Sequence, residues 1–104
     1  MKATIEGKTY NTETATCIAK DGYPGSVTDF QNWVEHLYVT AKGSYFLYGS
    51  GGPMSKYAEP CGNNSMGGGS KIIPMTKAEA LAWCEEHECE DAIEKHFADM
   101  VTEA

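Results

Sequence analysis

Three side chains that commonly bind metal, Cys84, His87 and Cys89, fall close together near the C-terminal end of this 104-residue chain. Residues three apart share one face of a helix, so Cys84 and His87 can converge. Cys89 joins them only if the helix ends near His87. We expect Cys61, in a Gly-rich segment, as the fourth ligand of a closed, structural zinc site. The alternative stays open that Cys84 packs as a small hydrophobic residue while the other two cap a surface turn.

The negative charge is concentrated at one end of the chain. The formal net charge is −7, and residues 76–104 hold nine acids against two lysines, which accounts for all of it. There is no arginine, so direct nucleic-acid binding, which needs clustered cations, is not expected. An acidic surface of this kind either keeps a helical face solvated or binds a basic protein. The candidate partner-binding residues are Glu85, Glu86, Glu88, Glu90, Asp91 and Glu94.

Catalytic motifs are not evident. Four cysteines and three histidines permit a Cys–His pair in principle, but no local nucleophile signature surrounds any cysteine. The Gly-rich stretch at residues 62–71 places its lysine and hydroxyl wrongly for a phosphate-binding loop. We therefore predict that the chain is not an enzyme.

The elements that must position these residues change type along the chain. Residues 1–75 read as β-rich, with residues 30–48 as the strongest hairpin signal and a Gly-rich loop over residues 49–70. In that hairpin, Trp33, Glu35 and Leu37 share one face of a strand. Residues 21–25 are predicted as a turn. The length fits one domain of residues 1–104.

Residues 76–104 read as two acidic helices with a break near residues 87–90. Thr76 and Glu79 form a capping box at the first helix. The predicted buried stripes contain Ala78, Leu81, Ala82 and Cys84 in the first helix, and Ile93, Phe97, Met100 and Val101 in the second. The predicted fold class is therefore α+β, a small antiparallel β-sheet followed by a C-terminal helical hairpin.

Four segments carry a resemblance to a known family: residues 10–19 (YNTETATCIA), 37–47 (LYVTAKGSYFL), 49–58 (GSGGPMSKYA) and 74–83 (PMTKAEALAW). Together they resemble a family of small, uncharacterised proteins from phages and mobile elements of Gram-positive bacteria. The chain also looks like small type II anti-CRISPR proteins. That resemblance implies binding to Cas9 and a block of DNA cleavage, and it transfers no catalytic residue.

These observations predict an anti-CRISPR protein that binds Cas9 through its acidic helices and blocks DNA loading or cleavage. The alternative is a small zinc-stabilised protein-interaction domain of a mobile element that acts on another host protein. No apolar leader or membrane span is evident, so we expect a cytoplasmic protein in the bacterial host, with no membrane partner.

Overall fold

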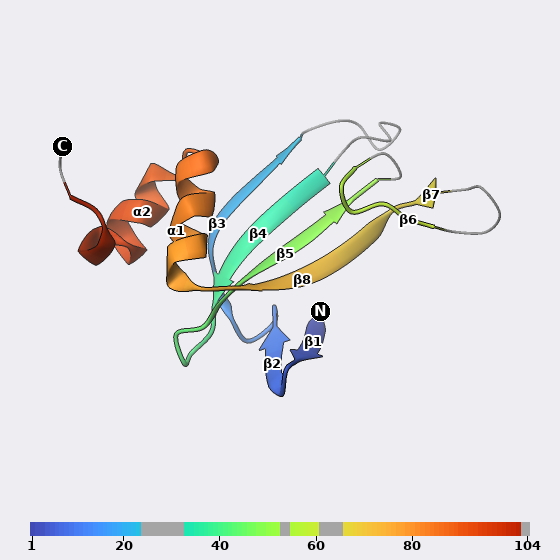
Figure 1. Ribbon diagram of the computed structural model, residues 1–104, viewed down its shortest axis with the longest axis horizontal. Helices are drawn as coiled ribbons and strands as arrows, with labels where there is room; N and C mark the ends of the chain where they lie inside the picture. The colour runs from blue at the N-terminus through green and yellow to red at the C-terminus, as the bar shows by residue number, and fades with distance from the viewer. Residues whose placement is uncertain (24–32, 53–54, 61–65, 103–104) are drawn as a thin grey trace.

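A four-stranded antiparallel sheet forms the centre of the molecule, and two helices follow it in the chain (Figure 1). The computed structural model describes residues 1–23, 33–52, 55–60 and 66–102. The sheet has the strand order β3-β4-β5-β8. A separate hairpin, β1–β2, precedes it, and the short pair β6–β7 lies between β5 and β8 in sequence. The chain is therefore α+β, as the sequence predicts.

The elements have the following bounds: β1 Lys2–Ile5, β2 Lys8–Asn11, β3 Thr16–Tyr23, β4 Trp33–Val39, β5 Tyr45–Gly51, β6 Glu59–Pro60, β7 Met66–Gly67, β8 Gly69–Met75, α1 Lys77–Glu86, α2 Glu90–His96 and the 3-10 turn η1 Ala98–Met100. The expected turn at residues 21–25 is wrong for residues 21–23, because β3 continues through Tyr23 and pairs with β4 there. Residues 24 and 25 of that turn lie outside the described residues.

The two faces of the sheet pack against different elements. Because side chains alternate along a strand, Leu37 and Leu47 face one side, and Tyr38 and Phe46 face the other. The first pair belongs to a buried cluster with α1 and α2. Phe46 belongs to a second cluster with Tyr10 of the β1–β2 hairpin. The helices and the N-terminal hairpin therefore cover opposite faces of one sheet.

Helix α1 begins at the predicted capping box. Oγ1 of Thr76 accepts a hydrogen bond from the Glu79 amide at 3.1 Å, and Oε1 of Glu79 accepts one from the Thr76 amide at 2.9 Å. The predicted buried stripe was wrong at Ala78 and Ala82, which are exposed. The buried residues are Ala80, Leu81, Trp83 and Cys84. The large indole of Trp83 turns inward, and this rotates the buried face relative to the prediction.

Helix α2 is shorter than predicted. Ile93 and Phe97 are buried as expected, but Met100 and Val101 are 39% and 43% exposed. The helix ends at His96, and the 3-10 turn η1 follows, so the expected spacing does not continue. No helix in the described part of the chain combines the length and apolarity that crossing a membrane requires.

Candidate functional site

The turn between α1 and α2 sets the position of the acidic residues. The Glu88 amide donates to the Glu85 carbonyl at 3.3 Å, and the Cys89 amide donates to the Cys84 carbonyl at 2.9 Å. This pair of bonds is the Schellman motif, in which the residue after the C-cap takes a left-handed conformation and is usually Gly. Here that residue is Glu88, with φ 56°. A side chain at such a φ costs roughly 1–2 kcal/mol.

We call the six predicted partner-binding residues the acidic surface. All six are exposed: Glu85, Glu86, Glu88, Glu90, Asp91 and Glu94. Glu88, Glu90 and Asp91 line a hollow of about 300 Å³, together with Cys89 and with apolar side chains that include Ile18 of β3. The structure thus brings three of the six acidic residues together around one concave feature.

Helix dipoles explain some of these carboxylates and not others. Glu90 and Asp91 lie in the first turn of α2, where negative charge is favourable and where the N-cap Cys89 makes no side-chain capping bond to the helix. Glu85 and Glu86 lie at the C-terminal end of α1, and the last turn of that helix has no basic residue to balance them. Negative charge near a helix C-terminus is unfavourable. Glu85, Glu86 and Glu88 therefore lie where the local fold disfavours them.

A network of polar side chains centred on the buried Glu35 lies directly behind this turn, and it is not among the sites predicted from the sequence. Asp21 of β3 and Glu35 of β4 are paired across the two strands, so two carboxylates lie side by side on the face that packs against α1. His87, the C-cap of α1, lies against both. Its Nδ1 donates to Oδ2 of Asp21 at 2.6 Å, and its Nε2 is 3.7 Å from Oε1 of Glu35. The hydrogen bond from His87 lowers the pKa of Asp21 below its usual value.

Glu35 is the centre of the network and is only 1% exposed. It accepts hydrogen bonds from Trp83 Nε1 at 3.1 Å and from the Tyr57 hydroxyl, and Lys56 Nζ lies 2.7 Å from its Oε2. Burial alone would raise the pKa of Glu35, but the bonds from Lys56, Tyr57 and Trp83 outweigh it and the pKa lies below the usual value. Burial and the bond to Glu35 raise the pKa of Tyr57, which stays protonated at neutral pH.

Gly49 makes room for this arrangement. It lies opposite Glu35 on β5. A Cβ at this position would collide with the Tyr57 ring, so the phenol can reach Glu35 only over a residue without a side chain. The rings of Trp83 and His87 stack at a centroid distance of 4.2 Å, and Lys56 Nζ lies 5.4 Å from the centre of the Trp33 ring. The network therefore joins three strands, the segment that carries Lys56 and Tyr57, and α1.

This network acts as a structural tie. Glu35 is enclosed, and both of its oxygens are engaged by Trp83, Tyr57 and Lys56, so the carboxylate holds α1 and the segment of residues 56 and 57 against β4. One signal in the sequence pointed to it, because the alternation of β4 places Glu35 on the same face as Trp33 and Leu37. A lone acid on an apolar face needs buried partners. Those partners came from positions far apart in sequence, which no local pattern identifies.

The predicted zinc ligands lie in different environments. Cys84 is fully buried in the core, and burial raises the pKa of its thiol to about 11. Both ring nitrogens of His87 face carboxylates, and Cys89 is half-buried. Within the described residues no group of three His, Cys, Asp or Glu is placed to hold a metal ion. Cys84, His87 and Cys89 do not fit one ion in this arrangement. Cys61 lies outside the described residues, and the zinc site stays a prediction.

No protein-family model, no curated protein and no solved structure matches this chain.

Proposed function

We propose that this chain is a non-catalytic protein-binding domain that binds a basic surface of a partner protein through its acidic surface. The observation that carries the proposal is the hollow of about 300 Å³ between β3 and the start of α2, with Glu88, Glu90 and Asp91 among its lining residues. Carboxylates beside the apolar side chains of Ile18 and Ala92 match a Lys or Arg side chain, which has an apolar stem and a charged head.

Glu88 supports a binding role more strongly than its neighbours do. Its left-handed backbone is easiest for Gly, so a Glu at this position costs stability. Strained residues of this kind persist at functional sites more often than elsewhere. Glu85 and Glu86 add to the argument, because they lie at the helix end where negative charge is unfavourable. A charged face needed only for solvation has no reason to occupy these positions.

The resemblance to type II anti-CRISPR proteins selects the first partner to test, a Cas9 effector in the bacterial cytoplasm. Such effectors hold nucleic acid in a positively charged channel. An acidic surface on a chain with net charge −7 would be steered toward that channel, and the association would weaken as salt concentration rises. Occupying the channel would block DNA loading or cleavage without any catalytic residue.

The test is co-purification with Cas9, with and without guide RNA, followed by a DNA-cleavage assay. We expect the triple variant Glu85→Lys/Glu86→Lys/Glu88→Lys to lose capture and inhibition. Because lysine is favourable at the end of α1, this variant should remain folded. The control is Glu13→Lys/Glu59→Lys, which reverses two exposed carboxylates outside the acidic surface and should keep binding.

Three outcomes separate the parts of the proposal. Complete DNA cleavage in the presence of excess protein would end the assignment to Cas9. Binding that is equally weak in the triple variant and in the Glu13/Glu59 control would show that total charge acts, and not the acidic surface. Capture of a different host protein that depends on Glu88 would support the binding surface and identify another partner.

A further inference from the structure

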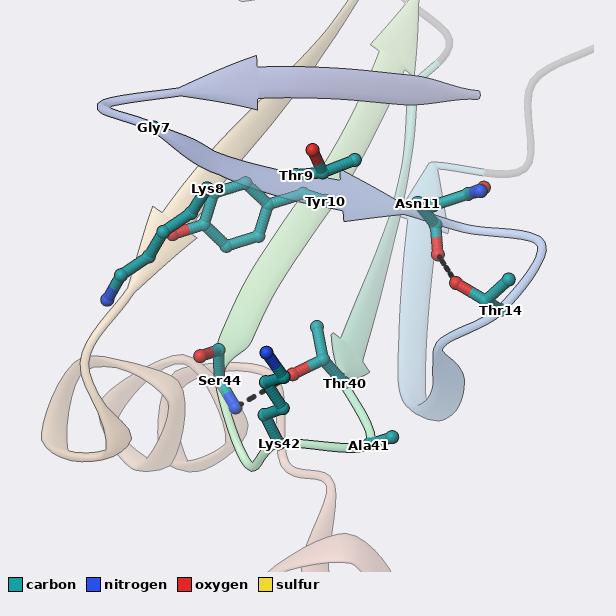
Figure 2. A pocket seen from close by; sticks show the side chains of 10 residues that line it. All are labelled: Gly7, Lys8, Thr9, Tyr10, Asn11, Thr14, Thr40, Ala41, Lys42 and Ser44. Carbon is teal, nitrogen blue, oxygen red and sulfur yellow. Dashed lines mark hydrogen bonds between the residues drawn. The ribbon is translucent and has the colours of Figure 1, made fainter.

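A second concave site lies beside the β1–β2 hairpin, and none of its lining residues belongs to a helix. It is a pocket of about 670 Å³ between the β1–β2 hairpin and the turn that joins β4 to β5. Figure 2 shows side chains entering it from both sides, with Lys8 and Tyr10 on β2 and Lys42 and Ser44 on the turn. Its volume is within the range of small-molecule sites.

Tyr10 points to a ligand in this pocket. The residue is only 7% exposed, and its ring packs edge-on against Phe46 at 5.5 Å. Among the described residues the structure gives its hydroxyl no hydrogen-bond partner, although Tyr10 lines the pocket. No fully buried side-chain oxygen in the described part of the chain lacks a partner, so this hydroxyl reaches the accessible surface of the pocket while the ring is buried. It can therefore donate to a molecule inside the pocket.

The charge of the pocket is opposite to that of the whole chain. Lys8 and Lys42 line it, and none of its lining residues is acidic. Within the described residues neither lysine is within ion-pair distance of a carboxylate, whereas Lys56 and Lys77 are both paired. Two unpaired ammonium groups at the walls of a hollow concentrate a positive field there. An anion is the ligand that this field selects.

Local structure holds both walls of the pocket in place. In the turn, the Thr40 amide donates to the Ser44 carbonyl at 2.8 Å, and the Ser44 amide donates to Oγ1 of Thr40 at 3.0 Å. In the hairpin, Glu6 and Gly7 both have positive φ, 51° and 79°, which is the type I′ geometry of a two-residue turn. The pocket is thus formed before a ligand arrives, which reduces the entropy lost on binding.

We infer that this pocket binds a small organic phosphate, with the phosphate group between Lys8 and Lys42 and the Tyr10 hydroxyl donating to it. A phosphate monoester carries a charge of about −1.5 to −2 at neutral pH, which two lysines can balance. A nucleic-acid strand fits less well, because it needs a longer row of cations and would meet a chain of net charge −7.

The experiment is an NMR titration of the full chain with three probes: inorganic phosphate, adenosine monophosphate and adenosine. We expect saturable shifts of the backbone amides of residues 8–11 and 40–44 with the two phosphate-containing probes and none with adenosine. Lys42→Met should weaken binding about tenfold, as expected for the loss of a charged hydrogen-bond partner. Tyr10→Phe should weaken binding several-fold while it keeps the ring packed on Phe46.

The matched control is Lys71→Met, which removes an exposed lysine on β8 outside the pocket and should leave the affinity unchanged. Three results would overturn the inference: no saturable shift at millimolar phosphate, equal binding of adenosine and its monophosphate, or an equal loss of affinity in Lys71→Met and Lys42→Met. None of these depends on the acidic surface, so this test and the test of partner binding are independent.

Discussion

The indole nitrogen of Trp83 donates a hydrogen bond of 3.1 Å to Oε1 of Glu35, across 48 positions of the chain. This bond ties α1 to β4 at the centre of the sheet. Glu35→Ala would leave the Trp83 N–H and the Tyr57 hydroxyl without their acceptor. We expect this variant to lower the free energy of unfolding by about 3 kcal/mol, measured by urea denaturation. Glu13→Ala, at an exposed position, should change it by no more than about 0.5 kcal/mol. Equal losses in both variants would contradict the tie.

The same carboxylate should make stability sensitive to acid. The pKa of Glu35 lies below its ordinary value of 4.5, because its hydrogen bonds outweigh the effect of burial. The unfolded chain therefore binds this proton more readily than the folded chain does. The contribution to stability is present above the ordinary pKa and is lost as pH falls through the folded pKa.

We expect the difference in unfolding free energy between the wild type and Glu35→Gln to be largest near neutral pH. It should shrink below about pH 4.5, since Gln resembles the protonated acid. The pKa of Asp21 is lowered as well, mainly by its bond to His87, so Asp21→Asn should change the profile in the same direction. Urea denaturation at a series of acidic pH values measures the unfolding free energy of Glu35→Gln and of Asp21→Asn against the wild type. A difference independent of pH would exclude ionised Glu35 as the source.

Replacement of Glu88 should separate stability from binding. Glu88 has φ 56° at the Schellman position. Glu88→Gly removes this backbone strain and should raise the free energy of unfolding by roughly 0.5–1 kcal/mol. It also removes a carboxylate from the acidic hollow, so capture of the basic partner should weaken. Glu88→Gln is the matched control, because it keeps the strain and removes only the charge. A gain in stability in Glu88→Gln would show that the carboxylate charge, and not the left-handed backbone, destabilises the folded chain at this position.

Thiol reactivity should follow the burial of the cysteines. Cys17 is exposed, whereas burial raises the pKa of Cys84 to about 11. In a Cys61→Ser background at neutral pH, a disulfide reagent should modify Cys17 rapidly and Cys84 only on unfolding. Mass spectrometry after partial modification identifies the sites. Rapid modification of Cys84 in the folded chain would place that thiol outside the core.

The zinc interpretation has its own measurement. Elemental analysis of wild-type protein purified without added metal should give about one zinc per chain if Cys61, Cys84, His87 and Cys89 bind it. That zinc should be lost in Cys84→Ser. In the zinc-bound protein His87 would have to leave Asp21, so removal of zinc by a chelator should alter the NMR signal of the His87 ring. Protein free of zinc would leave His87 in the carboxylate network and would contradict the zinc interpretation.

Local patterns in the sequence predicted much of the fold. The capping box at Thr76 and the break near residues 87–90 rest on side chains a few positions apart, and the structure confirms both. The geometry of the turn between α1 and α2 was not predicted, because Glu88 occupies the Schellman position in place of the usual Gly. The inward face of α1 was misjudged, since it depends on the acceptor that Trp83 finds on β4.

The candidate sites also differ in whether local sequence or contacts between distant segments form them. The acidic surface could be predicted because charge is a property of sequence and exposed carboxylates need no particular partner. The Glu35 network could not, because Asp21, Tyr57 and His87 meet Glu35 only after the sheet forms. The phosphate pocket likewise joins a hairpin and a turn that are about 30 positions apart. Contacts between distant segments have no local signature.

His87 lies one residue before Glu88 and stacks on the ring of Trp83. A macromolecule that displaces the turn at Glu88 would also change the surroundings of this indole, whose emission responds to neighbouring rings and charges. The chain thus contains a built-in optical reporter for occupancy of its acidic end. Fluorescence of a variant that keeps Trp83 and replaces Trp33 would follow complex formation in solution without any attached dye.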